Sequence, residues 1–316
     1  MTQFIADSPV VCVSCGADTP RLLFKKACAE QNIELLKCPN CSMVFLKPPV
    51  KNKTVVLYDY YAKRMHLDRN KLYNQATEVS FKKLLNIFKS NCSCGNRILD
   101  VGCGDGHFID VCLKQGWDAQ GIETSQSAVK LCLKFNLPVR PLDFFSLELK
   151  PGSFNIITLF EVLEHVHSFE RFLTRAEELL TPGGILYLTT PNFASLDSRI
   201  LKSEWSVIHY EHLNYFTPRT LKEVFSSHTK FSLVSLKTRN ISLDALCFFA
   251  GGRKKDFPIP EKLYYSTNNP CVNQEQRLRS LALKISFLGF IKNAVNILLN
   301  LCDSGSTITL LAKKPK

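Results

Sequence analysis

Four cysteines near the N-terminus form two pairs whose spacing suits a metal site. Cys12 and Cys15 lie in the stretch CVSC, Cys38 and Cys41 lie in CPNC, and 22 residues separate the pairs. Each CxxC turn directs two thiolates toward one point, and four thiolates at about 2.3 Å complete the tetrahedron that structural zinc prefers. We therefore predict a closed zinc site with a structural role. The alternative is a set of buried free cysteines.

A second stretch, LFEVLEHVH at residues 159–167, gathers carboxylates and imidazoles. On a helix, Glu161, Glu164 and His165 would stand at positions i, i+3 and i+4 and would share one face. These side chains could bind a metal ion, act as acid and base, or form the exposed side of an ordinary helix. His167 is expected to be exposed. The stretch alone leaves these interpretations open.

The elements around this stretch predict a parallel sheet. Residues 97–107 read RILDVGCGDGH, an apolar strand followed by a glycine-rich turn and the start of an amphipathic helix. Glycines allow a tight turn and close approach to a ligand, and Glu123, about 20 residues further on, ends the next strand, where a carboxylate can bind ribose hydroxyls. Strands and helices then alternate as far as ILYLTTPN (185–192), which indicates an α/β fold with helices on both faces of the sheet.

Three of these motifs, ILDVGCGDGHF, GIETS and LTPGGILYLTTPN, resemble those of class I S-adenosylmethionine-dependent methyltransferases. The resemblance covers residues 75–245 and implies a Rossmann-like seven-stranded sheet with a small zinc-ribbon module before it. It also implies an antiparallel final hairpin, for which residues 231–239 and 306–314 have strand character. The resemblance places Asp143 beside the adenine of the cofactor, and a simple turn residue is the alternative for this position.

The same resemblance assigns residues to the parts of an S-adenosylmethionine cofactor. The methionine and ribose would contact Asp100, Gly102, Cys103 and Gly104. The ribose hydroxyls would contact Glu123 and Thr124, the adenine would contact Asp143 and Phe144, and the sulfonium would lie beside Phe160.

The cysteine pairs, YDYY at residues 58–61 and HYEHLNYF at residues 209–216 together resemble bacterial sugar C-methyltransferases. In those enzymes a Glu-His pair in a similar stretch is implicated in catalysis, and it matches Glu211 and His212. Histidine is a suitable base near neutral pH, and a carboxylate can orient it. We predict His212 as the base with Glu211 as its partner, while a substrate-binding or structural role remains open. His165 is expected to reach the same pocket.

The ExxEH pattern also resembles methyltransferases that bind magnesium or another divalent ion, including ubiquinone-pathway and small-RNA end methyltransferases. Glu161, Glu164 and His165, with His209 or His212, would then be the ligands. We keep magnesium as the lesser alternative to a histidine base. The acceptor is expected to be a small molecule, such as a sugar or another biosynthetic intermediate, methylated on oxygen or carbon.

The composition describes an ordinary globular protein with an excess of positive charge. The chain has 316 residues, 45% hydrophobic content, a net charge of +12 and 13 cysteines, without a secretory signal or a transmembrane run. We therefore expect a cytoplasmic protein with reduced thiols. The charge keeps an RNA methyltransferase with a zinc-ribbon recognition module as the alternative. A non-catalytic interaction protein is the third class, and the oligomeric state is not indicated.

We expect five segments along the chain. They are a zinc-ribbon module (1–50), a linker and covering helix (51–90), a methyltransferase core (91–245), a helical insertion that is a candidate lid (246–305), and the last strand of the core sheet (306–316). Within the insertion, residues 280–302 have the apolar spacing of an amphipathic helix, which could pack on its own domain, form a partner surface or contact a membrane.

Overall fold

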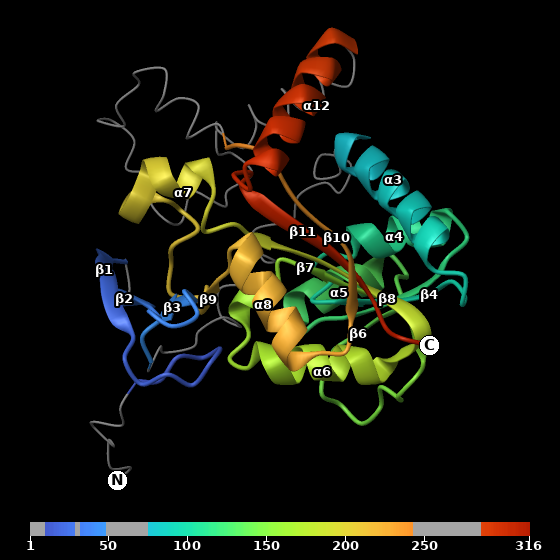
Figure 1. Cartoon of the computed structure of the whole chain (residues 1–316). Coiled ribbons are helices and arrows are strands. Elements are labelled where there is room, and N and C mark those ends of the chain that lie inside the picture. The colour runs from blue at the N-terminus through green and yellow to red at the C-terminus, as the bar shows by residue number, and fades with distance from the viewer. Residues whose placement is uncertain (1–9, 29–31, 49–74, 243–285) are drawn as a thin grey trace.

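The computed structural model describes residues 10–28, 32–48, 75–242 and 286–316 (Figure 1). Its centre is a seven-stranded sheet in the order β10-β11-β8-β7-β4-β5-β6. Strands β4 to β8 are parallel to one another, whereas β11 runs antiparallel to both β8 and β10. The strands are β4 (Arg97–Val101), β5 (Asp118–Ile122), β6 (Val139–Arg140), β7 (Phe154–Phe160), β8 (Leu180–Pro191), β10 (Ser232–Arg239) and β11 (Thr307–Lys313). The Rossmann-like sheet with an antiparallel final hairpin is thus confirmed.

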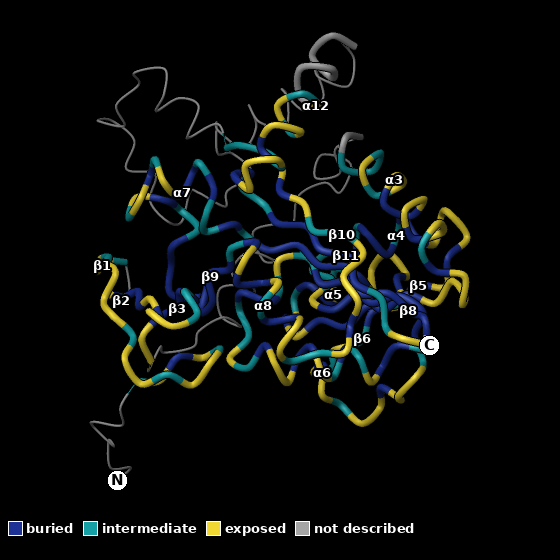
Figure 2. Tube along the Cα trace, viewed as in Figure 1, coloured by how far each residue is buried: buried dark blue, intermediate teal, exposed yellow. Residues whose placement is uncertain are grey.

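Helices cover both faces of this sheet because its inner strands are apolar on both sides. The central strand β7 is buried along nearly its whole length, as expected for a parallel strand between two helical layers (Figure 2). Neighbouring residues face opposite layers: Ile98 packs in the apolar cluster with α3 and α4, and Leu99 packs in the cluster with α6 and α8. The helices are α3 (Gln75–Asn91), α4 (His107–Lys114), α5 (Gln126–Lys134), α6 (Phe169–Leu179), α7 (Leu196–Leu201), α8 (Pro218–His228) and α12 (Ser286–Leu301).

The glycine-rich turn after β4 requires glycine for its backbone angles. Gly102, Gly104 and Gly106 have φ values of 67°, 54° and 76°, in the left-handed region that other residues adopt with strain. Gly106 is also the N-cap of α4, so the turn leads directly into that helix. The turn therefore places backbone N–H groups at the carboxyl edge of the sheet, where parallel α/β folds bind ligands.

The N-terminal strands form a second sheet that includes a strand from the core. β1 (Arg21–Ala27), β2 (Asn32–Lys37) and β3 (Val44–Leu46) are followed in the sheet by β9 (Asn214–Tyr215). Figure 1 shows β9 beside β3, at the point where the N-terminal strands meet the core. The sequence did not predict β9, because a two-residue strand has no periodicity to detect.

Two stretches have local structures that the sequence pattern does not reveal. The helix considered for the ExxEH stretch does not form: Leu163–His165 form a single 3-10 turn, η1, and Glu161 has a φ of 53°. The TPGG stretch is part of β8, and a register irregularity between β7 and β8 accommodates it. A second 3-10 turn, η2, spans Lys202–Glu204.

Part of the expected linker (residues 51–74) and most of the expected insertion (residues 246–285) lie outside the described residues. The described part of the insertion includes α12, which begins at Ser286 and lies within the stretch of residues 280–302 that was predicted to form an amphipathic helix. Asn300 and Asn296 of α12 accept hydrogen bonds from the backbone N–H groups of Thr238 and Asn240 at the end of β10. Among the described helices, none is long and apolar enough to span a bilayer.

Candidate functional site

Glu123 is held beside the glycine-rich turn by two backbone hydrogen bonds. Its Oε2 accepts from the N–H of Gly104 at 2.9 Å, and its Oε1 accepts from the N–H of Ser125 at 2.8 Å. The side chain is buried, whereas the neighbouring Thr124 is exposed. Each carboxylate oxygen has two lone pairs, so both oxygens keep capacity for a ribose diol.

Asp100 lies in β4 just before this turn, and Cys103 lies within the turn. Asp100 is buried, and the hydroxyl of Thr158 on the adjacent strand β7 donates to its Oδ1 at 2.6 Å. Burial raises the pKa of Asp100 to about 7, although the Thr158 hydrogen bond opposes this shift. The Cys103 side chain lies over Gly121 of β5, where an added Cβ would come within 2.6 Å of the Cys103 sulfur. Gly121 therefore makes room for the turn.

Asp143 and Phe144 follow β6, Phe160 ends β7, and the surroundings of the three side chains differ. Asp143 is exposed and accepts from the N–H of Phe145 at 2.7 Å. Phe144 is buried, and its ring lies against Phe172 with a centroid distance of 4.3 Å. One face of the Phe144 ring is thus already in contact with the protein core.

The ring of Phe160, at the end of β7, joins a cluster with α3 and α4. Its centroid is 5.7 Å from Phe81, 5.0 Å from Phe108 and 5.7 Å from Tyr187. Because Phe81 belongs to α3, this helix contacts the carboxyl edge of the sheet directly.

Two carboxylates meet immediately after β7. Glu164 is 1% exposed, and its Oε2 accepts from the hydroxyl of Thr190 at 2.9 Å. Glu161 reaches solvent with its side chain but is surrounded by protein at longer range, so desolvation raises its pKa. The pKa of Glu164 is raised well above its usual range, first by burial and then by the charge of Glu161. Two such neighbours favour either a shared proton or a bound cation.

Three histidine rings lie against this pair. The ring centroids of His165 and His212 are 4.6 Å apart, and those of His212 and His209 are 3.9 Å apart. The Nδ1 of His165 lies 3.1 Å from the backbone carbonyl of Glu211, so in the neutral ring Nδ1 donates and Nε2 keeps a lone pair. Burial lowers the pKa of His165 to about 4 and that of His209 to about 3. The pKa of His212 is also lowered well below its usual range, first by burial.

Glu164, His165 and His212 offer three ligand atoms within 4.8 Å of one another. Within the described part of the chain, Glu164 Oε1 and His212 Nδ1 are buried atoms without a hydrogen-bond donor or acceptor opposite them. Leaving buried polar atoms unpaired is costly, and a carboxylate with neutral imidazoles is a donor set that binds divalent ions. These residues therefore fit a divalent cation as well as they fit an acid/base group.

The main chain of Glu211 contacts both flanking histidines. Its carbonyl lies 3.1 Å from His165 Nδ1, and its N–H donates to His209 Nδ1 at 3.3 Å. The pairing of the Glu211 and His212 side chains stays a prediction. Glu211 thus helps to orient both flanking histidines through the main chain.

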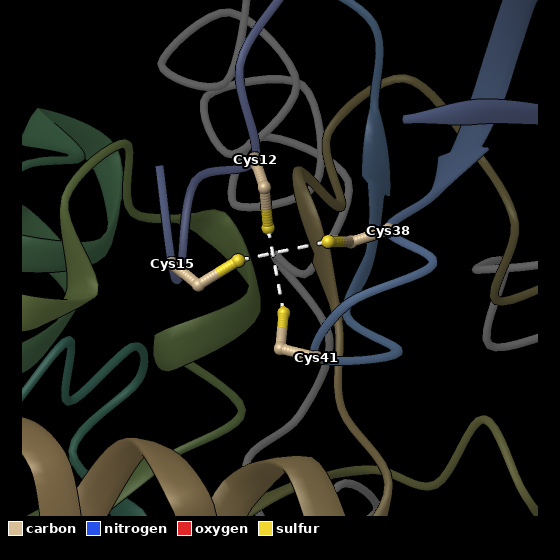
Figure 3. A group of neighbouring side chains, drawn as sticks. All are labelled: Cys12, Cys15, Cys38 and Cys41. Atoms are coloured by element: carbon tan, nitrogen blue, oxygen red, sulfur yellow. Dashed lines mark hydrogen bonds between the residues drawn. The ribbon is translucent and has the colours of Figure 1, made fainter. Parts of the chain in front are cut away.

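The four predicted zinc ligands converge from two turns (Figure 3). The sulfurs of Cys12 and Cys41 are 3.5 Å apart, and those of Cys15 and Cys38 are 3.6 Å apart. The edge of a tetrahedron with zinc-sulfur bonds of about 2.3 Å is close to these values. The four thiols therefore fit a zinc ion without rearrangement.

Three residues at the site were missed by the sequence. Thr158 and Thr190 hold Asp100 and Glu164, and Arg239 of β10 donates to the Tyr187 hydroxyl at 3.2 Å near Glu161. Both threonines interrupt apolar strands at their carboxyl ends, which is the signal that could have identified them.

A family model described as a methyltransferase domain matches residues 65–236, more than half of the chain. The chain belongs to this methyltransferase domain family. It is 31% identical over 157 residues to the ubiquinone biosynthesis O-methyltransferase of Methylococcus capsulatus, and the matched region covers 48% of this chain and 64% of that relative. It is 26% identical over 132 residues to the Chromobacterium violaceum protein of the same name, and the matched region covers 40% of this chain and 57% of that relative.

This methyltransferase domain protein thus spans less than two thirds of the length of these curated relatives. A solved SAM dependent methyltransferase from Archaeoglobus fulgidus aligns with a TM-score of 0.49 and 17% identity, covering 75% of this chain and 94% of that one.

Proposed function

We propose that this protein transfers a methyl group from S-adenosylmethionine to a hydroxyl oxygen of a small molecule. The observation that carries the proposal is the shared edge of the sheet: the glycine-rich turn follows β4, Glu123 follows β5, and Glu164 and His165 follow β7, all at the carboxyl ends of parallel strands. His212 lies against Glu164 and His165, with the three ligand atoms within 4.8 Å of one another. A cofactor and an acceptor that bind at one edge can meet. Membership of the family and the O-methyltransferase names of the relatives support methylation on oxygen.

The cofactor would use the residues that surround the turn. Glu123 would hold the ribose hydroxyls, and Gly102, Cys103 and Gly104 would line the methionine part. The N–H groups of these three residues are bonded within the protein, to the Ile122 carbonyl and to Glu123, so the glycines would contribute by leaving room for the ligand. The sulfonium would lie near the Phe160 ring, because an aromatic face attracts a cation. Asp143 would meet the adenine, for which its exposed carboxylate is available.

His212 would take the proton of the acceptor hydroxyl. Its Nδ1 is unpartnered among the described residues, and its low pKa keeps the ring neutral at pH 7. His165, oriented by the Glu211 carbonyl, would hold the acceptor from the other side. A low pKa also makes imidazole a weak base, because proton transfer is most efficient when the pKa lies near the working pH.

The same residues provide the second candidate mechanism. A divalent ion held by Glu164, His165 and His212 would lower the pKa of the acceptor hydroxyl. The unpaired Glu164 Oε1 is the specific observation that favours this ion over a lone histidine base. In either mechanism the site recognises a hydroxyl rather than a nonpolar acceptor.

The test is a screen with methyl-labelled S-adenosylmethionine against phenolic, sugar and RNA acceptors. We expect label on the oxygen of a small molecule, and loss of cofactor binding in Glu123→Gln, since its amide nitrogen would face a backbone donor. Glu148→Gln is the matched control, because Glu148 is exposed and pairs with Arg140 on the surface. Label found only in RNA would replace this proposal with the RNA alternative.

A further inference from the structure

The segment that carries His209 and His212 is bonded on both sides. The N–H of Leu213 donates to the carbonyl of Glu164 at 2.8 Å, and the carbonyl of Leu213 accepts from the N–H of Leu46 at 3.0 Å. β3 then continues the contact, since Val44 pairs with Tyr215 and Phe45 pairs with Asn214. One residue after His212, the main chain therefore links the acidic turn to the N-terminal module.

Lys26 of β1 makes a second link just before the histidines. Its ammonium donates to the backbone carbonyls of Trp205 at 3.2 Å and of Ile208 at 2.7 Å. Ile208 directly precedes His209, and hydrogen bonds from a charged donor are stronger than neutral ones. This contact fixes the course of the chain as it enters the site.

The buried apolar side chains of β2 and β3 join clusters that also contain core residues. Along β2 and β3 successive side chains face opposite ways, and each face packs on a different part of the core. Leu36 and Phe45 join the cluster that contains α6 and α8. The other face joins a cluster of residues before and within β9: Leu201, Trp205, Ile208, Tyr210, Leu213 and Tyr215. A detachable recognition module would not bury both faces in this way.

The cysteine cluster sets the geometry of β3. The N–H of Cys38, which follows β2, donates to the carbonyl of Met43 at 2.9 Å, and the N–H of Ser42 donates back to Cys38 at 3.0 Å. This turn leads straight into Val44, the first residue of β3. A zinc ion on Cys38 and Cys41 would fix the turn and thereby the strand that pairs with β9.

We infer that the N-terminal zinc module supports one side of the acceptor site. Lys26 and β3 hold residues 209–215 in position. The inference rests on the proposed function for its effect on turnover, but the positioning itself does not depend on that function. It predicts that disturbing the module impairs acceptor use while leaving cofactor binding intact, because Glu123 is held beside the glycine-rich turn by the N–H groups of Gly104 and Ser125, which belong to the core.

Lys26→Met in the full chain tests the inference, with Lys25→Met as the matched control. Both changes remove one ammonium from β1, but Lys25 is exposed and forms an ion pair with Glu34 within the N-terminal sheet. In Lys26→Met we expect backbone hydrogen exchange across residues 209–215 to be about tenfold faster or more, as loss of a charged hydrogen bond implies. We expect a raised acceptor KM and an S-adenosylmethionine Kd within about twofold of the parent.

Lys26→Arg is the rescue variant, since it keeps a charged donor, and it should restore slow exchange. Removing zinc from the four cysteines, with a chelator strong enough to compete with thiolate ligands, should produce the same faster exchange at residues 209–215 in the unmodified chain. This readout holds even if the acceptor is never found, so a failure of the proposed function is distinguishable from a failure of this inference. Equal exchange in Lys26→Met and Lys25→Met, or exchange unaffected by metal removal, would overturn it.

Discussion

At the scale of single residues, two buried atoms without a hydrogen-bond partner among the described residues lie in the proposed acceptor site. Glu164 Oε1 and His212 Nδ1 lie within a group whose ligand atoms are all within 4.8 Å of one another. Natural proteins pair such atoms unless a ligand, an ion or a reacting group uses them. Both are therefore expected to act on the acceptor or on an ion that binds it.

Replacing His212 should abolish most of the activity without loss of the cofactor. In His212→Asn we expect kcat to fall about 100-fold or more, the usual contribution of a positioned base, with S-adenosylmethionine affinity unchanged by calorimetry. His167→Asn is the control, because His167 is exposed in the same loop region. Equal rates for the two variants would remove His212 from the mechanism.

The low histidine pKa values predict an unusual pH profile. The neutral ring is the active form, and burial lowers the pKa of His165 to about 4 and depresses that of His212 as well. As pH falls, activity is lost only on protonation, so kcat/KM should stay level through the ordinary histidine range near pH 6.5 and decline well below it. Rates measured from pH 8 to pH 4.5 in a constant-ionic-strength buffer check this. An acid limb at pH 6.5 would show that the histidines are not buried as described.

At this scale the sequence predicted residues whose role depends on local spacing. Glu123 and the three glycines were identified because a turn and the next strand end lie close along the chain. Thr158 and Thr190 were not, because their partners Asp100 and Glu164 are brought to them only by the parallel register of the sheet. For Glu161 a helical position was one interpretation considered, and nothing in the local pattern signals its left-handed backbone.

At the scale of elements, Phe81 of α3 packs on residues at the carboxyl edge of the sheet. The Phe81 ring contacts His107 at a centroid distance of 5.2 Å and Phe108 at 5.0 Å, besides Phe160. This side chain brings α3 against the end of β7, where the sulfonium is proposed to bind.

Phe81→Ala should both destabilise the fold and weaken cofactor binding. Aromatic pairs contribute about 0.5–1.5 kcal/mol each beyond area burial, so the free energy of unfolding should fall by about 1–3 kcal/mol. Denaturant unfolding and calorimetry measure the two effects. Ile87→Ala on the same helix is the control, since Ile87 is 47% exposed and should change neither quantity appreciably.

Elements with a long apolar pattern were predicted, and β9 was not. Strands such as β7 and β8 are continuous apolar runs, whereas β9 exists only because β3 supplies its partner. The zinc module and the histidine segment consequently looked independent in the sequence. They are neighbours in one sheet.

At the scale of the whole molecule, the N-terminal strands and the core should unfold together. Since both faces of the small sheet pack on core clusters, zinc binding should contribute to the stability of the entire chain. We expect about one zinc per chain by elemental analysis, and a single calorimetric transition that moves to lower temperature when the metal is removed. Two transitions, with the later one insensitive to the metal, would show a separate module.

The measurement that tests the account most directly is methyl transfer from labelled S-adenosylmethionine, with the methylated atom located by NMR. We predict label on a hydroxyl oxygen of a small-molecule acceptor, retained in His167→Asn and lost in His212→Asn. Label on carbon, label confined to RNA, or undiminished transfer by His212→Asn would contradict the account.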